Sequence, residues 1–568
     1  MSEPVQGGAW AEEAVDAAGG LDLLLTDAAL GMVRRLRPDS SLLRLAAGLA
    51  RRPGFVARQA VLLGTELGLI AAGRSEITAS PRDRRFSDPA WKDNPLLRRS
   101  VQAYLAASRS AGELVAGASL SWRDDTRLKF LLTNLVAAAA PSNNPLLSPV
   151  AWKAAIDTGG ENAVRGLRAL ASDLATPPRV PAMVPPGSFE VGKDLAVTPG
   201  GVVHSSEVFE LIQYQPVTET VYRYPLLIVP PMINKYYIVD LAPGRSMVEY
   251  LVAQGHQVFV MSWRNPDARH RDWDLDTYGG ALVEALAAAR AIGGAAKVSV
   301  CALCSGGIMA AMVAAQLSVT GQLDQLASLC LGVAVLDEAR AGLASAVIDE
   351  RTARLAEAAS RARGYLDGRS LAEVFAWLRP NDLIWNYWVN NYLLGREPPP
   401  FDILFWNADT TRMTAGLHRD FLHLGVTNGL VRPGGVTMLG SPVDLGLIDR
   451  DSYIIAGITD HICPWQSCYR STQLVGGRSR FVLSTSGHIA AMVNPPGNDK
   501  ARYQVAKESP ADPQEWLRSA ETCHGSWWPD YAGWLAERCG EETAAPDEFG
   551  GGGLVPICDA PGTYVYDH

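Results

Sequence analysis

The chain has 568 residues and a mass of 60.9 kDa, enough for roughly two to four structural units and a large hydrophobic core. Its formal charge is −9 and no basic stripe is present, which argues against a nucleic-acid-binding protein. The N-terminus lacks the basic and apolar segments of a secretory signal, and no apolar run approaches the roughly 18 residues of a membrane span. The 8 cysteines are scattered without metal-ligand spacing, which fits a reducing compartment. We therefore predict a cytoplasmic protein with no transmembrane segment and no metal site.

The first third of the sequence is predicted to be helical. Residues 1–185 carry apolar side chains at helical spacing, for example over residues 95–117, and so predict a mainly α-helical N-terminal domain. Residues 175–187 then contain five prolines, a density that disrupts both helix and sheet. We place a domain boundary there, between residues 185 and 186.

The remaining residues, 186–568, are predicted to form a catalytic domain. Short β-branched runs alternate with helical stretches, which is typical of a parallel α/β sheet. Between about residues 329 and 432 the strands give way to helical, aromatic sequence, which we interpret as an insertion. The candidate strands are residues 221–230, 257–263, 297–302, 452–457 and 480–484.

The strongest chemical signal lies at residues 297–316. A β-branched strand leads to Cys304, two glycines and an Ala/Met-rich helix. This order is typical of a nucleophile elbow, a turn that exposes a reactive side chain at the N-terminus of a helix. The helix dipole lowers a thiol pKa, and the backbone N–H of Ser305 would help to bind an oxyanion. The alternative is that Cys304 is a small buried apolar residue.

Two later segments supply the partners that such a nucleophile needs. In the α/β-hydrolase fold the acid and then the histidine follow the nucleophile, each after a strand. Asp460 follows one candidate strand and His488 follows the next. We therefore predict an acyl-transfer site in which Cys304 attacks a carbonyl and His488 accepts its proton. Asp460 either orients the imidazole or activates a hydroxyl, with a loop cap as its alternative role, and His461 competes with His488 as the base.

A second oxyanion donor should come from the loop after an early core strand. Here that loop is residues 230–234, and its candidate is the backbone N–H of Met232 or Ile233, of which we select Ile233. The alternative is that the double proline in this loop simply ends a strand.

Several longer strings in the sequence are too unusual to be chance. They are FSDPAWKDN at 86–94, PMINKYY at 231–237, SWRNPD at 262–267, CSGG at 304–307, RPNDLIWNYWVNNYLLG at 379–395, FDILFWNADTT at 401–411, TDHICPW at 459–465, SGH at 486–488, NPPG at 494–497 and SWWP at 526–529. Over roughly residues 83–568 the sequence resembles the poly(3-hydroxyalkanoate) synthases, most of all the type II synthases, which prefer medium-chain monomers.

The resemblance implies an α/β-hydrolase fold with a helical cap, and an acyltransferase that polymerises (R)-3-hydroxyacyl-CoA with release of CoA. It implies that Cys304 holds the growing chain as a thioester, that His488 is the general base and that Asp460 activates the 3-hydroxyl of the next monomer. No cofactor is expected, because CoA is part of the substrate and a product. The resemblance also implies a homodimer that carries the nascent polyester chain at the surface of a cytoplasmic granule.

Two other functions fit the same residues. A cysteine α/β-hydrolase acting as a thioesterase or polyester depolymerase would use the same triad, because fold and triad do not fix the acceptor. An inactive granule-coating protein is the non-enzymatic alternative, and the intact set of Cys304, Asp460 and His488 argues against it.

The aromatic insertion lies where hydrolases carry a cap. Trp385, Trp388, Phe401 and Trp406 are predicted to line an acyl channel under this cap, with ordinary cap core as the alternative. The phosphates of CoA call for a basic residue near the mouth, and Arg264 is a candidate.

One residue departs from the family pattern. The family's nucleophile box usually begins with Gly, whereas this chain has Ala302. Alanine lacks the freedom of glycine at positive φ, so the elbow should survive if Ala302 keeps ordinary strand dihedrals. The change bears on the level of activity rather than on the type of reaction.

Overall fold

The computed structural model describes residues 40–339 and 350–568. The first 39 residues of the predicted helical domain and residues 340–349 of the predicted insertion lie outside this described part. The described residues divide into two units, so the predicted insertion at 329–432 is split between them. The helical unit comprises residues 40–186 and 369–401, and the catalytic unit comprises residues 187–339, 350–368 and 402–568.

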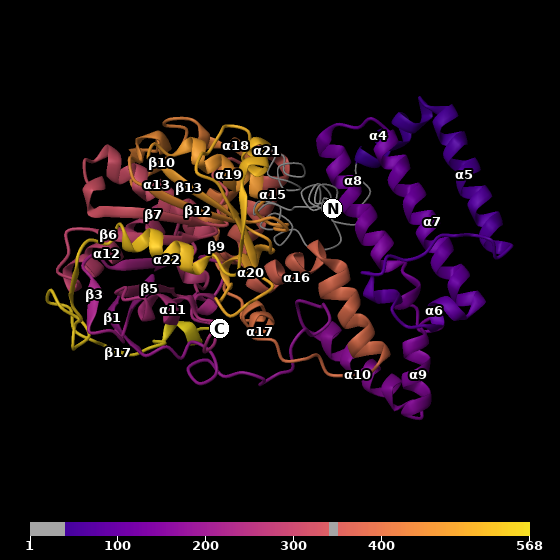
Figure 1. Ribbon diagram of the computed structural model, residues 1–568, viewed down its shortest axis with the longest axis horizontal. Coiled ribbons are helices and arrows are strands. Elements are labelled where there is room, and N and C mark those ends of the chain that lie inside the picture. The colour runs from indigo at the N-terminus through magenta and orange to yellow at the C-terminus, as the bar shows by residue number, and fades with distance from the viewer. Residues whose placement is uncertain (1–39, 340–349) are drawn as a thin grey trace, which may run out of the picture. The chain divides into compact units, whose positions relative to one another are not determined.

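The helical unit is built from short and medium helices (Figure 1). Its α7 begins sharply because the side chain of Asn94 accepts hydrogen bonds from the backbone N–H groups of Leu96 and Leu97, and Pro95 fits the first helical position. The elements are α4 (Ser40–Ala50), α5 (Pro53–Ala71), η1 (Arg84–Phe86), α6 (Ala90–Asp93), α7 (Pro95–Gly117), α8 (Trp122–Ala138), η2 (Pro141–Asn143), α9 (Pro149–Asp157), α10 (Glu161–Ala175), α16 (Gly368–Leu378) and the π-helical η6 (Asn381–Trp385) and η7 (Trp388–Leu393).

Long-range hydrogen bonds attach residues 369–401 to the first helices of this unit. Asn162 donates from Nδ2 to the carbonyl of Leu393 at 2.8 Å, and Trp388 donates from Nε1 to the carbonyl of Asn143 at 3.1 Å. The partners are 231 and 245 positions apart in the sequence, so helical periodicity does not reveal them.

The catalytic unit contains an 11-stranded sheet in the order β15-β14-β13-β12-β7-β6-β4-β5-β2-β1-β17. The six strands from β13 to β5 are parallel to one another, and the strands outside them are antiparallel. The strands are β1 (Gly200–Ser205), β2 (Phe209–Tyr214), β4 (Leu226–Val229), β5 (Val258–Trp263), β6 (Val298–Leu303), β7 (Leu326–Gly332), β12 (Ser452–Gly457), β13 (Ser479–Ser484), β14 (Arg502–Val505), β15 (Glu521–His524) and β17 (Cys558–Asp559).

The predicted α/β class and all five candidate strand regions are confirmed. Five of the six parallel strands were visible in the sequence because both of their faces are buried, so that they read as continuous apolar runs. The sixth parallel strand, β7, was missed. The antiparallel strands were also missed: β14 is short and partly exposed, whereas β2 is fully buried and was missed despite that. The strand β7 runs to Gly332, so the predicted start of the insertion near residue 329 falls inside the sheet.

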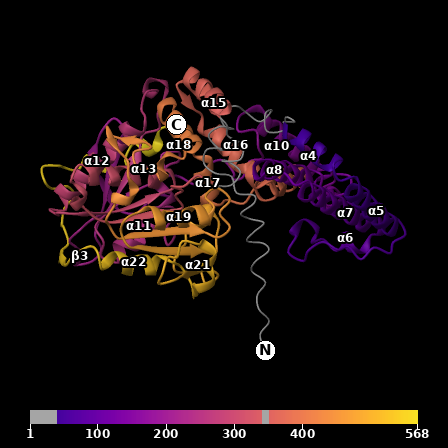
Figure 2. The ribbon, with the colours of Figure 1, turned by 90° about the horizontal axis from the view of Figure 1, so that it is seen from above.

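Helices cover both faces of the sheet (Figure 2). On one face α11 (Met247–Ala253) and α22 (Trp528–Ala536) share a hydrophobic core with Tyr453 and Ile455 of β12. On the other face lie α12 (Leu275–Ile292) and α13 (Ser305–Val319). This two-sided cover leaves the ends of the parallel strands as the place for a site.

The other elements of the catalytic unit surround this core. The helices are α15 (Glu350–Arg363), α17 (Asp402–Ala408), α18 (Ala415–Thr427), α19 (Trp465–Leu474), α20 (His488–Met492) and α21 (Pro513–Ser519). Three two-stranded pairs join β3 (Thr220–Tyr222) to β16 (Glu542–Ala544), β8 (Tyr365–Leu366) to β9 (Met413–Thr414) and β10 (Thr437–Met438) to β11 (Ser441–Pro442).

One helix bears on the membrane prediction. Within the described residues α5 alone has the length and composition to cross a membrane, with a mean hydropathy of 1.3 over its best window. It also carries the charged residues Arg58 and Glu66. The absence of a transmembrane segment therefore stays a prediction.

Candidate active site

Cys304 lies in the turn between β6 and α13. Its φ of +50° is in the left-handed region that residues other than glycine rarely adopt. Its backbone N–H donates to the carbonyl of Gly332 at the end of β7, at 2.8 Å. The predicted strand–turn–helix is thus present, and the neighbouring strand holds the strained residue in place.

The two glycines after Cys304 allow α13 to approach the sheet closely. A Cβ on Gly306 would lie 2.6 Å from the carbonyl oxygen of Pro230, and one on Gly307 would lie 2.7 Å from the Cβ of Ala334. Both distances are shorter than a carbon contact permits, so only glycine fits without movement of the helix. Ala302 lies within β6 and is not among the residues with positive φ. The elbow was expected to tolerate alanine at this position if its dihedrals were those of a strand, and this condition is met.

Asp460 follows the end of β12 and uses both of its carboxylate oxygens. Its Oδ1 accepts hydrogen bonds from the backbone N–H groups of Ile462 at 2.8 Å and Cys463 at 2.9 Å. Its Oδ2 lies 2.7 Å from Nδ1 of His488, and the carboxylate is fully buried.

His488 follows β13 as the first residue of α20. The loops that carry it and Asp460 are joined by a hydrogen bond from the backbone N–H of Ile458 to the carbonyl of Ser484 at 2.8 Å. His461, the competing candidate base, is partly exposed, and the contact with the carboxylate of Asp460 is made by His488.

A second thiol lies beside the nucleophile. The Sγ atoms of Cys304 and Cys463 and a ring nitrogen of His488 all lie within 4.8 Å of one another, and all three residues are buried. Because Nδ1 of His488 pairs with Asp460, its Nε2 is the nitrogen left for the two sulfurs. Cys463 was not among the site residues predicted from the sequence. The feature of the sequence that could have indicated it is its position three residues after Asp460, which places both residues in one hydrogen-bonded turn.

The surroundings favour a thiolate–imidazolium pair. The largest effect on the pKa of Cys304 is a hydrogen bond from the Cys463 thiol, which lowers it. Burial raises this pKa, but the hydrogen bond and the charge of His488 outweigh burial and bring the pKa to about 5. Burial by itself lowers the pKa of His488, but the charge of Asp460 and its hydrogen bond raise it to about 10. The hydrogen bond with Cys304 and burial raise the pKa of Cys463, which therefore stays a thiol.

The oxyanion candidates lie on two sides of the elbow. Ser305 is the first residue of α13, where backbone N–H groups point out of the helix, and its own N–H hydrogen-bonds to Cys304. The N–H of Met232 donates to Oγ of Ser305 at 3.1 Å, which leaves Ile233 as the candidate in that loop. The assignment of Ser305 and Ile233 to an oxyanion hole stays a prediction.

The four channel candidates are divided between the two units. Trp385 and Trp388 pack edge to face in the helical unit, with ring centroids 5.7 Å apart, and Phe401 is exposed at the end of that unit's second segment. Trp406 lies in α17 of the catalytic unit, where its Nε1 donates to the carbonyl of Lys235 at 2.7 Å. Trp406 thus supports the loop that carries Ile233, and the acyl channel stays a prediction.

Arg264, the candidate for CoA binding, contacts the C-terminal segment. Its guanidinium lies 4.0 Å from the ring centroid of Tyr564 and donates a hydrogen bond to the Tyr564 hydroxyl. Its Nε donates to the carbonyl of Glu207 at 2.7 Å. In this arrangement Arg264 serves the packing of the chain's end, and its role toward CoA stays a prediction.

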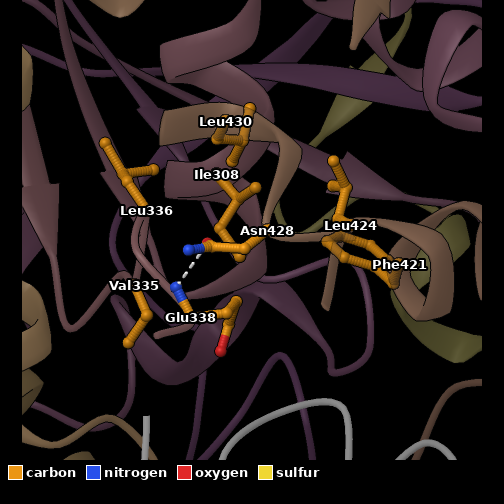
Figure 3. Close-up of a pocket in the computed structure, with 8 residues that line it drawn as sticks. All are labelled: Ile308, Val335, Leu336, Glu338, Phe421, Leu424, Asn428 and Leu430. Atoms are coloured by element: carbon orange, nitrogen blue, oxygen red, sulfur yellow. Dashed lines mark hydrogen bonds between the residues drawn. The ribbon is translucent and has the colours of Figure 1, made fainter. Parts of the chain in front are cut away.

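A small cavity lies beside the first turns of α13 (Figure 3). Ile308 reaches it from α13, and Phe421 and Leu424 reach it from α18. Asn428 lines another side, where its Oδ1 accepts the backbone N–H of Glu338 at 2.8 Å. The volume of about 10 Å³ has room for no more than about one water molecule, so this cavity is not an acyl pocket.

A larger cavity of about 420 Å³ lies between α12, α18 and residues 434–437. Asp274, Asp276 and Asp420 line it, and the one arginine there, Arg419, pairs with Asp420 at 2.6 Å. This acidic lining does not suit the phosphates of CoA.

Comparisons with known proteins identify the family and the fold of the catalytic unit. Residues 82–251 match the family described as "Poly-beta-hydroxybutyrate polymerase (PhaC) N-terminus", and residues 225–495 match the alpha/beta hydrolase fold. The chain is 45% identical over 515 residues to poly(3-hydroxyalkanoate) polymerase 2 of Ectopseudomonas oleovorans, covering 91% of this chain and 92% of that protein. It is 41% identical over 503 residues to the poly(3-hydroxyalkanoate) polymerase subunit PhaC of Cupriavidus necator, covering 87% and 85%.

Solved structures show a more distant similarity. An esterase from Exiguobacterium antarcticum is 12% identical with a TM-score of 0.30, covering 51% of this chain and 92% of that one. Brefeldin A esterase, a bacterial homologue of human hormone-sensitive lipase, is 13% identical with a TM-score of 0.30, covering 70% and 96%.

Proposed function

Because the chain belongs to the poly(3-hydroxyalkanoate) polymerase family, we propose that it joins (R)-3-hydroxyacyl-CoA units into polyester through a thioester on Cys304. The observation that carries this mechanism is the buried arrangement of Cys304, His488 and Asp460 at the ends of parallel strands. In it a nucleophile, a base and an orienting carboxylate stand in the order that acyl transfer requires.

In the first step the Cys304 thiolate attacks the thioester carbonyl of the substrate. A bond forms between Sγ and the carbonyl carbon, and the negative charge passes to the carbonyl oxygen, where the N–H groups of Ser305 and Ile233 would stabilise it. Collapse breaks the bond to the sulfur of CoA, and the imidazolium of His488 gives its Nε2 proton to that sulfur. The products are free CoA and acyl-Cys304.

In the second step the now neutral His488 accepts the proton of a 3-hydroxyl group from the next monomer. The hydroxyl oxygen forms an ester with the acyl carbon, and the Cys304 thiolate leaves. The ion pair between Cys304 and His488 is thereby restored. The chain, now longer by one unit, is carried as a thioester on the CoA of the incoming monomer. Cys304 then attacks this thioester, and the cycle repeats. Each added monomer releases one CoA.

The contacts of Asp460 support an orienting role in both steps. Its Oδ1 is occupied by two backbone N–H groups and its Oδ2 by His488. Three of its roughly four acceptor positions are therefore taken, and its side chain is fully buried, so little of it is left for a substrate hydroxyl. We therefore place the activation of the 3-hydroxyl on His488, with Asp460 acting through the imidazole.

Burial of the site favours a hydroxyl acceptor over water. Cys304 and His488 are each 5% exposed and Asp460 is 3% exposed. A site that excludes bulk water protects the thioester from hydrolysis between additions. This supports the polymerase over the thioesterase or depolymerase that the same triad would also permit.

The decisive test is the product of the reaction. The protein is incubated with 3-hydroxybutyryl-CoA and, separately, with 3-hydroxydecanoyl-CoA, and free CoA, insoluble polyester and soluble hydroxy acid are measured. We expect polyester with one CoA released per monomer, and the ratio of the two rates gives the preferred chain length, which we propose to be medium. Soluble acid without polymer would establish the hydrolase instead.

A matched pair of variants tests the nucleophile. Cys304→Ala should lower CoA release by at least about 10³-fold, because the covalent step is lost. Cys558→Ser, in the short strand β17, should retain the wild-type rate. Equal rates for Cys304→Ala and wild type would show that Cys304 is not the nucleophile.

The surface of α5 supports the proposed association with polyester granules. Only 6% of its best 18-residue window is buried, and Val61, Leu62, Leu67 and Leu69 are exposed. Exposed apolar side chains gathered along one helix are typical of an interaction surface. Serine at these four positions should reduce co-sedimentation with polyester granules without lowering CoA release from soluble substrate, whereas unchanged co-sedimentation would exclude α5. The homodimer stays a prediction that sedimentation equilibrium tests.

A further inference from the structure

Cys463 takes no covalent or proton-transfer part in the acyl-transfer steps, and it neither orients His488 nor binds the oxyanion in them. Its thiol lies within 4.8 Å of the Cys304 sulfur and of a His488 nitrogen, and it is buried. Two sulfurs and an imidazole nitrogen are the ligands that zinc prefers in proteins. The three residues are far apart in the sequence, which is why no metal-ligand spacing predicted this group.

We propose that Cys304, Cys463 and His488 form a binding site for a thiophilic divalent cation, with Zn²⁺ as its natural ligand, and that binding there switches the nucleophile off. Three protein ligands leave a fourth position of a tetrahedral site for water or for an oxygen of the substrate.

The distances allow this site with only small movements. Zinc binds thiolate at about 2.3 Å and imidazole at about 2.0–2.1 Å, so two sulfurs of one tetrahedral site lie about 3.8 Å apart. The ligand atoms here lie within 4.8 Å of one another, so a contraction of about 1 Å or less closes the site. Rotation of the cysteine side chains supplies movements of that size.

The surrounding contacts are those that a zinc site needs. Histidine ligands of metals donate their other ring N–H to a carboxylate, which fixes the ring and the tautomer. Nδ1 of His488 makes this contact to Asp460, and Asp460 is held by the backbone N–H groups of Ile462 and Cys463. One turn therefore positions both the second sulfur and the carboxylate behind the histidine.

Binding removes two protons from the resting site. Starting from the thiolate–imidazolium pair that the surroundings favour, His488 gives up its Nε2 proton and Cys463 gives up its thiol proton, so that Zn²⁺ meets two thiolates and a neutral imidazole. The metal is then bound to the Cys304 sulfur that would attack the thioester and to the Nε2 atom of His488 that would accept the proton. Acyl transfer stops and resumes when a chelator removes the metal.

Cobalt provides a readout that does not depend on activity. The full-length protein is reduced with a phosphine, freed of metal and titrated with Co²⁺ while the thiolate-to-cobalt charge-transfer band is followed. We expect one Co²⁺ per chain, displaced by Zn²⁺, in wild type and in Cys558→Ser. Cys463→Val should weaken binding by at least about tenfold, because a ligand is lost. No charge-transfer band in wild type, or equal affinity in Cys463→Val, would overturn the proposal.

A second measurement needs no variant in the site. Zn²⁺ should slow the alkylation of Cys304 by iodoacetamide in the wild-type protein at least tenfold, as measured by mass spectrometry of the Cys304 peptide, and leave Cys558 unaffected. Equal alkylation of Cys304 with and without Zn²⁺ would also overturn the proposal. Both measurements are made without substrate, so they hold whether or not the proposed polymerase mechanism does.

The inhibition is tested separately and rests on the proposed nucleophile. Micromolar Zn²⁺ should suppress CoA release by the wild-type enzyme, and a chelator should restore it. If the metal binds but CoA release continues, the metal site is supported and Cys304 is refuted as the nucleophile. If Zn²⁺ inhibits CoA release but Co²⁺ gives no charge-transfer band, the metal site is refuted.

Discussion

Asp460 has both carboxylate oxygens occupied inside the protein, one by two backbone N–H groups and the other by His488. The sequence left open whether this residue orients the imidazole or activates a hydroxyl. The contacts favour the first role, because three of the roughly four acceptor positions are taken and the side chain is fully buried.

The Asp460→Asn variant separates the two roles. An asparagine keeps the bonds from Ile462 and Cys463 through its oxygen and presents an NH₂ group to Nδ1 of His488, which imposes the wrong tautomer. We expect the acylation burst and the steady rate of CoA release both to fall about 10³–10⁴-fold in rapid-quench experiments. A normal burst followed by slow elongation would show that Asp460 acts directly on the hydroxyl.

A second residue predicts a pH dependence of stability. His256 is 1% exposed, its ring stacks on Tyr222 with centroids 4.9 Å apart, and burial lowers its pKa to about 4. The unfolded chain binds this proton near pH 6.5. Between these values the unfolded state holds more protons, so the free energy of unfolding decreases as the pH falls from about 6.5 toward about 4.

The His256→Phe variant removes this dependence and keeps the stacking. Between about pH 7.5 and about pH 5 the wild type should lose about 2 kcal/mol more stability than the variant, measured as urea-unfolding curves at both values. His423→Phe is the control, because His423 is exposed, and it should follow the wild type. An identical loss in wild type and His256→Phe would contradict the prediction.

At the scale of elements, three strand ends assemble the site. β6, β12 and β13 are parallel members of one sheet, so the residues that follow them meet at the same edge. The approach of α13 to β4 completes the elbow, and the glycines after Cys304 make it possible.

A pair of glycine substitutions tests this approach. Gly306→Ala should lower stability by about 1–3 kcal/mol and reduce CoA release, because its Cβ would press on the Pro230 carbonyl and displace α13. Gly533→Ala, in α22 with nothing within 4 Å of the added Cβ, should raise stability by about 0.5–1 kcal/mol. Thermal unfolding of both variants measures the contrast, and equal effects would show that the close contact does not matter.

At the scale of the whole molecule, the C-terminus returns to residues far earlier in the catalytic unit. The carboxylate of Glu210 accepts hydrogen bonds from the backbone N–H groups of Thr563 and Tyr564 at 2.9 Å and 3.0 Å. Nζ of Lys235 donates to the carbonyls of Tyr564 and Asp567. Glu210 and Lys235 are 3% and 2% exposed, so the last residues satisfy two charges that the core would otherwise leave without partners.

Deletion of residues 560–568 should therefore destabilise the catalytic unit by about 3–5 kcal/mol, as measured by thermal unfolding. Deletion of His568 alone keeps the bonding carbonyls and should change the melting temperature little. Replacing Glu210 with Gln and Lys235 with Met in the deleted chain should restore part of the loss. A deletion of 560–568 with wild-type stability would refute this account.

The sequence alone determined the family, the α/β class, the central strands and the order of nucleophile, acid and histidine. These features depend on local rules: alternation and burial of β-branched runs, the small residues of a tight turn, and the chain order of the fold. The tertiary structure showed that His488, and not His461, contacts the carboxylate of Asp460, and that backbone N–H groups bind its other oxygen. It also showed that residues 369–401 are joined to the first helices. It also placed Cys463 beside Cys304. Such contacts join residues that are distant in the chain, and their geometry follows from packing that residue type and spacing do not encode locally.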